Sequence, residues 1–86
     1  MANNVFQSFA HPSNGADVTP NDSADLARAG ILYVGIGGNI ALVTVGGDTL
    51  TLTGVPSGTF VPVRVRRVLA TNTTATSILC FYDKYE

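Results

Sequence analysis

The sequence has little charge and few of the residue types that carry out chemistry. Charged residues make up 13% of its 86 residues, against about 25% in typical soluble domains, and the net charge is −1. The chain has no tryptophan, one histidine and one cysteine, Cys80, so an internal disulfide is excluded. Without a basic field that would attract a polyanion, we expect no nucleic-acid partner.

Long hydrophobic runs are also missing. The apolar stretches fall well short of the roughly 20 residues that a membrane-spanning helix needs, so we expect no membrane partner. The opening residues, MANNVFQSFAHP, carry neither the basic region nor the apolar region of a secretory signal. This pattern predicts synthesis in the cytoplasm.

Candidate catalytic and metal-binding residues are few. His11 stands beside Pro12 with no second group to position it, and Glu86 is the one glutamate. Three aspartates lack the spacing of a calcium-binding EF-hand loop: Asp17, Asp22 and Asp25. The glycine-rich residues 35–38 precede a predicted strand, whereas a dinucleotide-binding loop precedes a helix. We therefore expect no enzymatic activity, no cofactor and no metal site.

Hydrophobic residues, in contrast, make up 45% of the chain. Small domains bury a smaller share of their surface than large ones, about 60% near 60 residues. A chain that is both small and poor in charge is therefore left with apolar surface that water does not cover well. The composition predicts a permanent assembly, in which neighbouring subunits cover part of each copy.

From Gly30 onward the sequence predicts β-strands, and we place them at residues 31–36, 39–45, 49–53, 59–69 and 77–83. Turn residues separate them at 37–39, 46–48 and 56–58. Residues 49–53 alternate threonine and leucine, as a half-buried strand does. We interpret residues 30–55 as two hairpins in succession, with the first strands buried on both faces. The expected fold is all-β, a small antiparallel sandwich or barrel of about five to six strands, in a single domain at residues 29–86.

Residues 1–28 sustain no helical or strand period, and we interpret them as an extended N-terminal arm. Residues 18–23, VTPNDS, predict a turn because proline fixes φ and the residues after it offer local hydrogen bonds. Two interpretations of the arm remain. It is disordered until it meets a partner, or Val5, Phe6 and Phe9 anchor it on a neighbouring subunit.

Residues 63–68, VRVRRV, place Arg64 and Arg66 on one face of a strand and valines on the other. Arg67 breaks this alternation, and one extra residue at 66–67 restores it, so we predict a β-bulge there. The arginines form a solvated basic face, an intersubunit contact or a site for a polyanion. In the second case, Asp17, Asp22 and Asp25 are candidate partners, since arginine binds carboxylates in a bidentate manner.

A carbohydrate-binding module is the alternative in a different functional class. The polar loop at residues 71–76 offers hydroxyl groups that could bind sugar. Tyr33, Tyr82 and Tyr85 are the tyrosines available to stack on a sugar ring.

Several short motifs occur in a familiar order: VTPNDS at 18–23, LYVG at 32–35, GVPSGT at 54–59, and PVRVRRVLAT at 62–71 followed by TTAT at 73–76. In these motifs the chain resembles a family of small structural proteins of tailed phages and phage-like gene transfer agents, which includes head-spike base proteins. The resemblance covers about residues 17–82.

The resemblance implies a non-enzymatic virion structural protein that forms an all-β homo-oligomer on the capsid exterior. A pentamer is favoured and a trimer is the alternative. It would serve as a head-spike base, a capsid decoration protein, or a tail or baseplate component. The implied partners are copies of itself, the major capsid protein and a spike fibre protein for host-surface attachment. The residues that we predict at a subunit or capsid interface are Val5, Phe6, Phe9, Asp22, Asp25, Arg64, Arg66 and Arg67.

Overall fold

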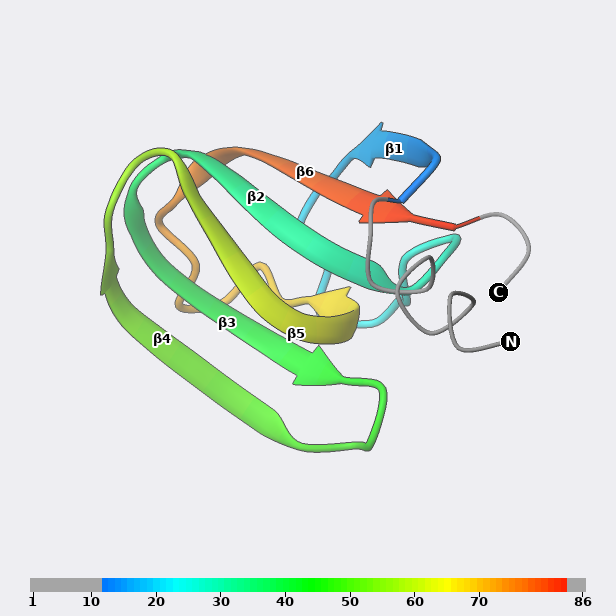
Figure 1. Cartoon of the computed structure of the whole chain (residues 1–86). Coiled ribbons are helices and arrows are strands. Elements are labelled where there is room, and N and C mark those ends of the chain that lie inside the picture. Colours follow the sequence, from blue (N-terminus) through cyan, green and yellow to red (C-terminus); the bar gives the residue numbers. More distant parts are fainter. Residues whose placement is uncertain (1–11, 84–86) are drawn as a thin grey trace.

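A computed structural model of the chain describes residues 12–83, and these form six strands without a helix (Figure 1). All strand pairs are antiparallel and belong to one sheet, ordered β1-β6-β2-β5-β3-β4. The all-β prediction is therefore confirmed. The strands are β1 (Asn14–Asp17), β2 (Gly30–Ile36), β3 (Gly38–Thr44), β4 (Thr49–Val55), β5 (Thr59–Val68) and β6 (Thr76–Tyr82).

The five predicted strands all form, but the first predicted hairpin is wrong. β2 and β3 follow each other directly at Gly37, yet β5 lies between them in the sheet. Gly37 makes this sharp change of direction possible, because a Cβ atom there would overlap the carbonyl oxygen of Val55. The second predicted hairpin does form, since β3 and β4 are paired neighbours. The glycines at residues 37–38 predicted the change of chain direction but not which strands pair.

β5 bends and takes part in both halves of the sheet. Its first half pairs with β2 and its last residues pair with β3. Two irregularities produce the bend: β5 advances four residues from Val61 to Val65 while β2 advances two, and Arg66 is an extra residue opposite β3. The predicted bulge at 66–67 is therefore confirmed. It turns Val65 and Val68 toward the core and leaves Arg66 and Arg67 partly exposed.

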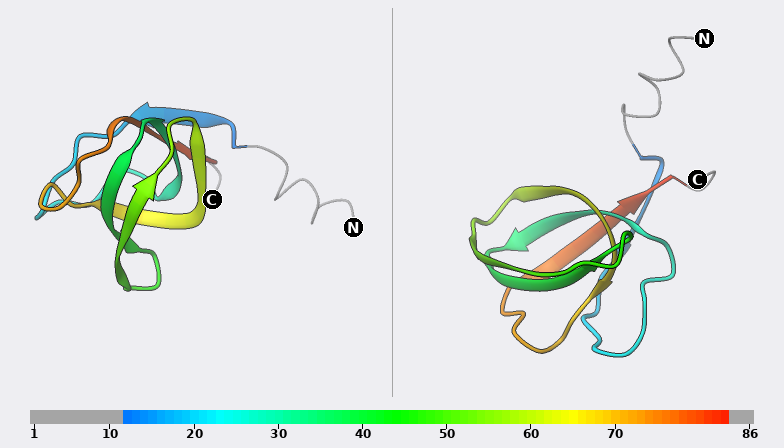
Figure 2. Two further views of the ribbon diagram at one scale, coloured as in Figure 1. Left: turned by 90° about the vertical axis from the view of Figure 1, so that its left-hand side faces the viewer. Right: turned by 90° about the horizontal axis from the view of Figure 1, so that it is seen from below.

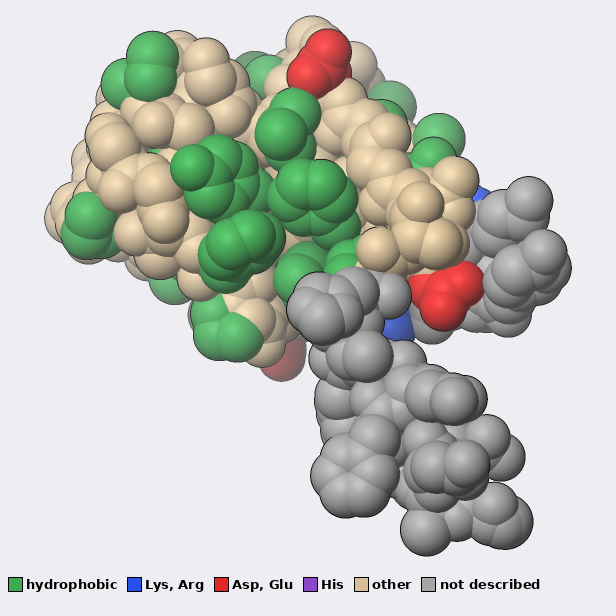
Figure 3. Space-filling view, turned by 45° about the horizontal axis from the view of Figure 1, so that its top comes forward, with side chains coloured by type: hydrophobic (Ala, Val, Ile, Leu, Met, Phe, Trp, Pro, Cys, Tyr) green, Lys and Arg blue, Asp and Glu red, His purple; other side chains and the backbone are tan. Residues whose placement is uncertain are grey.

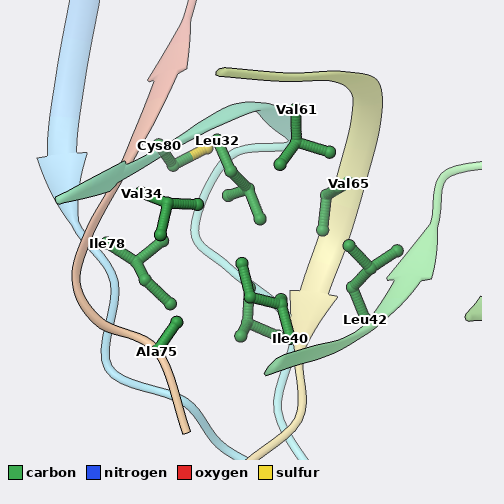
Figure 4. Close-up of a cluster of buried hydrophobic side chains, with 10 residues drawn as sticks. Leu32, Val34, Ile40, Leu42, Val61, Val65, Ala75, Ile78 and Cys80 are labelled. Carbon is green, nitrogen blue, oxygen red and sulfur yellow. The ribbon is translucent and has the colours of Figure 1, made fainter. Parts of the chain in front are cut away.

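The sheet curls around one hydrophobic core (Figures 2 and 4). Alternate residues of β2 and β6 point inward, as expected for strands with one buried face. β3 is different, because five consecutive residues from Ile40 to Thr44 are buried. The prediction of burial on both faces therefore fits β3 but not β2. The core cluster consists of Leu32, Val34, Ile40, Leu42, Val61, Val65, Val68, Ala75, Ile78 and Cys80.

Residues 12–28, the second part of the predicted arm, lie against the domain. β1 pairs with β6, and the backbone then continues with hydrogen bonds from Asn21 N to Val68 O and from Leu26 N to Arg66 O. Leu26 also packs against the core. The chain has the extended form that we expected, but β1 was not predicted. Val5, Phe6 and Phe9 lie outside the described residues.

Both ends of the sheet are open in the part of the chain that the structure describes. β1 and β4 each have one strand neighbour, so the outer backbone edge of each strand pairs with no other strand within residues 12–83. With so few charges along β4, the outer edge of this strand lacks the usual protection against pairing with another chain.

None of residues 12–83 forms a helix long and apolar enough to cross a membrane.

Candidate interface surfaces

The first surface is a cluster of four charged residues, Asp22, Asp25, Arg66 and Arg67, which we call the charged corner. The β5 bulge presents both arginines toward the loop that holds the aspartates. Asp25 Oδ1 accepts hydrogen bonds from Arg67 Nε at 2.8 Å and Arg66 Nη1 at 3.1 Å. Arg67 Nη1 also donates to the carbonyl oxygen of Asp22 at 3.4 Å. The charged corner thus ties the loop to β5 within one chain.

Asp22 fixes the same loop to the β5–β6 connection. Its two carboxylate oxygens accept from the Thr71 backbone N–H at 2.9 Å and from the Thr71 hydroxyl at 2.7 Å. The preceding Asn21 side chain accepts from the backbone N–H groups of Ser23 and Ala24. These are the local hydrogen bonds that the VTPNDS motif predicted, and they hold residues 21–24 in a tight turn.

Both aspartates of the charged corner have a lowered pKa. Hydrogen bonds from Thr71 to the ionised carboxylate lower the pKa of Asp22. The pKa of Asp25 is lowered chiefly by the hydrogen bond from Arg67, with the charges of Arg67 and Arg66 adding to it. These carboxylates remain ionised at neutral pH, where their contacts to β5 and its following loop are complete.

The structure therefore separates Arg64 from the other two arginines. The predicted pairing of the aspartates with arginines occurs, but Arg66 and Arg67 meet Asp25 of their own chain. Arg64 lies exposed at the β5 bend, where its carbonyl oxygen accepts from Val45 N at the end of β3. That any of these residues lies at an interface between subunits stays a prediction.

The second surface is a group of four apolar side chains on the outer side of β2, β5 and β6, namely Tyr33, Phe60, Leu79 and Phe81, which we call the aromatic face. Tyr33 lies directly opposite both Phe60 and Leu79 in the sheet register. The Phe60 ring centroid is 4.9 Å from that of Tyr33 and 6.1 Å from that of Phe81. Figure 3 shows hydrophobic side chains gathered on one face of the molecule.

Phe60 is the most accessible member of the aromatic face, with 55% of its surface exposed. Beside it, Leu79 and Phe81 line a shallow hollow together with Gly15 and Asp17 of β1. Gly15 keeps this hollow open, because a Cβ atom there would come within 2.9 Å of the Phe81 ring. The hollow and the rings form one continuous apolar surface with a single acid at its rim.

Comparison with known proteins shows that the chain is similar to a chain of a solved particle structure. No protein-family model and no curated protein sequence matches the chain. A solved structure does match, described as the capsid of a native GTA (gene transfer agent) particle computed with C5 symmetry. Its chain is 44% identical, the match covers 81% of this chain and 82% of that one, and the TM-score is 0.74. This chain belongs to the structural proteins of gene transfer agent particles.

The other sequence candidates fit a gene transfer agent structural protein. Residues 12–83 contain no cluster of histidine, cysteine and acidic residues that could hold a metal ion. Cys80 is buried, and burial raises the pKa of its thiol. His11 lies outside the described residues. The match to the capsid structure identifies a virion structural component. The aromatic face is the surface that sequence reasoning missed.

The residues suggested for sugar binding are largely engaged within this gene transfer agent protein. In the 71–76 loop, the Thr73 and Thr74 hydroxyls accept hydrogen bonds from the backbone N–H groups of Ala41 and Asn39. Tyr82 packs against the core, and the Arg28 guanidinium lies 5.6 Å from its ring centroid. Tyr33 belongs to the aromatic face, and Tyr85 lies outside the described residues.

Proposed function

We propose that this protein is a non-enzymatic homo-oligomer on the exterior of a phage-like particle, where it forms the base of a head spike. It binds the major capsid protein at a fivefold vertex and anchors a fibre that contacts the host surface. A pentamer is the favoured oligomer. The observation that carries the proposal is the 44% identity to a chain in a gene transfer agent capsid computed with C5 symmetry.

Three features of the chain support this role. An exposed aromatic face on a protein with 13% charged residues favours contact with other proteins. The open edges of β1 and β4 also offer backbone groups to neighbours. Within residues 12–83, three side chains considered as candidates have other roles: the Cys80 thiol lies in the core, and Asp22 and Asp25 bind Thr71 and arginines.

Native mass spectrometry of the purified protein, followed by electron microscopy of purified particles, tests the proposal. We expect a closed oligomer, with fivefold-symmetric density at vertices that disappears from particles made without this protein. Density spread over the whole capsid would instead identify a decoration protein, and density at the tail would identify a tail or baseplate component. A single copy that binds no particle would refute the structural role.

Arg64 offers a test of the arginine side of the proposed interface. Because Arg64 is exposed and lies outside the charged corner, Arg64→Glu should weaken oligomer formation without unfolding the domain. Arg66→Glu is the matched comparison, since it places a second acid beside Asp25 and should lower the thermal midpoint as well. Normal oligomer mass for Arg64→Glu would return that residue to the solvated basic face.

Carbohydrate binding remains the second candidate because Tyr33 and Phe60 form an adjacent ring pair at the surface. Aromatic rings with one accessible face can stack on sugars as well as on protein side chains. A glycan array probed with the isolated protein and with Tyr33→Ala distinguishes the two. Binding by the isolated protein that Tyr33→Ala abolishes favours the carbohydrate module, and binding that requires a separate fibre protein favours the spike base.

A further inference from the structure

The aromatic face has the properties of a protein-binding surface and lacks a partner within residues 12–83. Phe60 is more than half exposed and stands between Tyr33 and Phe81, so a large ring surface faces outward. Apart from Asp17, the outward-facing side chains paired in this part of the sheet are uncharged. Its occupant should therefore be apolar, short of charge and able to place a ring in the hollow beside Phe81.

Residues 1–11 of the same sequence have this chemistry. The segment MANNVFQSFAH contains Val5, Phe6 and Phe9, and it has no lysine, arginine, aspartate or glutamate. It joins the described chain at Pro12, just before β1, which borders the hollow. An uncharged segment with three large apolar side chains thus joins the domain at the margin of an exposed apolar face.

The direction of β1 favours the face of another copy over that of the same chain. β1 runs antiparallel to β6, with Asn14 opposite Tyr82 and Asp17 opposite Leu79. Asn14 lies opposite Tyr82, the last residue of β6, so Pro12 and Ser13 precede the sheet on the side away from the row that contains Leu79, Tyr33 and Phe60.

We propose that the N-terminal segment of one copy, residues 1–11, binds the aromatic face of the next copy in the oligomer. The apolar side chains of Val5, Phe6 and Phe9 cover Phe60 and enter the hollow between β1 and β6. Each copy both gives a segment and receives one, so the contact is head-to-tail, and it forms a ring when the rotation between neighbouring copies closes. This inference rests on the proposed homo-oligomer and names the surfaces that join its copies.

Crosslinking between two singly substituted proteins tests the contact directly. One protein carries Gln7→Cys, which leaves all three apolar residues of the segment intact, and the other carries Asp17→Cys at the rim of the hollow. Cys80 stays in place because it is 3% exposed in the core. The two proteins are mixed, assembled and treated with a short bismaleimide. We expect a crosslinked product that contains one copy of each.

The matched control replaces Asp17→Cys with Asp48→Cys, an exposed site at the β3–β4 turn, far from the aromatic face. It should give little mixed product. Equal crosslinking to Asp17→Cys and Asp48→Cys overturns the proposal. So does crosslinking confined to a single chain in the double variant Gln7→Cys/Asp17→Cys, because the segment would then cover its own face.

A mutant cycle on assembly supplies a second readout. Phe60→Ser and the segment variant Phe6→Ser/Phe9→Ser should each raise the protein concentration at which half of the copies assemble by tenfold or more. If the two sites touch, the combined variant should assemble as well as whichever of the two separate variants assembles less well. Effects that multiply would show that the sites act separately. If the wild-type protein assembles and the two increases in assembly concentration multiply, this contact alone is refuted. If the wild-type protein never assembles, the proposed function is refuted.

Discussion

The charged corner and the aromatic face differ in whether their side chains find partners within the chain. In the charged corner, Asp25 binds two arginines and Asp22 binds Thr71, so the polar groups satisfy one another inside one chain. On the aromatic face, Tyr33 and Phe60 touch each other and still expose ring surface. The first surface stabilises the fold, and the second is available to a neighbour.

This difference shows why charged side chains are a poor guide to the interface in this protein. Exposed ion pairs contribute little net free energy, typically about 0–1 kcal/mol. A few central residues carry most of the binding free energy at protein interfaces, with about 2 kcal/mol or more each, and aromatic residues are enriched among them. Four measurements test whether the two surfaces have these separate roles.

The largest effect should come from Phe60→Glu. A charge at the centre of the aromatic face must lose its water on assembly, and a loss of about 2 kcal/mol corresponds to roughly 30-fold weaker association. Incorporation into purified particles, measured against wild-type protein in the same cells, should fall accordingly. Thr49→Glu, at the exposed start of β4 and outside the hollow that Phe60 lines, is the matched control and should be incorporated normally. Equal loss for both variants would remove the distinction.

Asp25→Asn should affect the fold and spare the assembly. It removes the negative charge that holds Arg66 and Arg67, so the thermal midpoint should fall by a few degrees, while the oligomer mass from native mass spectrometry stays the same. Asp48→Asn, an exposed turn residue, should leave both unchanged. A normal midpoint with a smaller oligomer would instead place Asp25 between subunits.

Acid should weaken the charged corner with a definite sign. The pKa values of Asp22 and Asp25 are lowered in the folded state, so their stabilising contribution is complete above the ordinary value of 3.8 and is lost as the pH falls through the lower folded values. Unfolding followed by circular dichroism from pH 6 downward should show this loss below about pH 4. Asp22→Asn/Asp25→Asn should show a weaker dependence, and an unchanged profile would contradict the assignment.

Salt should produce the smallest change in assembly. The Debye length falls to about 3 Å at 1 M salt, which weakens exposed ion pairs but not contact between apolar groups. The difference in thermal midpoint between wild type and Asp25→Asn should therefore shrink in 1 M sodium chloride. The oligomer mass, followed by sedimentation, should stay constant. Dissociation in salt would show that charge, rather than the aromatic face, holds the copies together.

Strand positions and local irregularities could be predicted from the sequence because their signals are local. The alternation at residues 49–53 located β4, and Arg67 revealed the bulge because it broke the pattern of VRVRRV. β1 has no such signal, since NGAD is small and polar and becomes a strand by pairing with the edge of β6. β1 therefore lies within the residues that the sequence assigned to the arm.

The order of the strands and the aromatic face depend on contacts between distant residues. Nothing near Gly37 indicates that β5 will lie between β2 and β3. Tyr33, Phe60 and Phe81 are far apart in the sequence and meet because β2 pairs with both β5 and β6. A single sequence contains the residues of this surface but not the register that gathers them.

The turn between β3 and β4 has a practical consequence for display of foreign peptides. It projects from the body of the domain, and a side chain added at Gly47 would meet no other atom within 4 Å (Figures 1 and 2). Such exposed turns tolerate insertions well. A short epitope placed between Gly46 and Gly47 should therefore leave the barrel-like core intact and remain accessible on the folded domain.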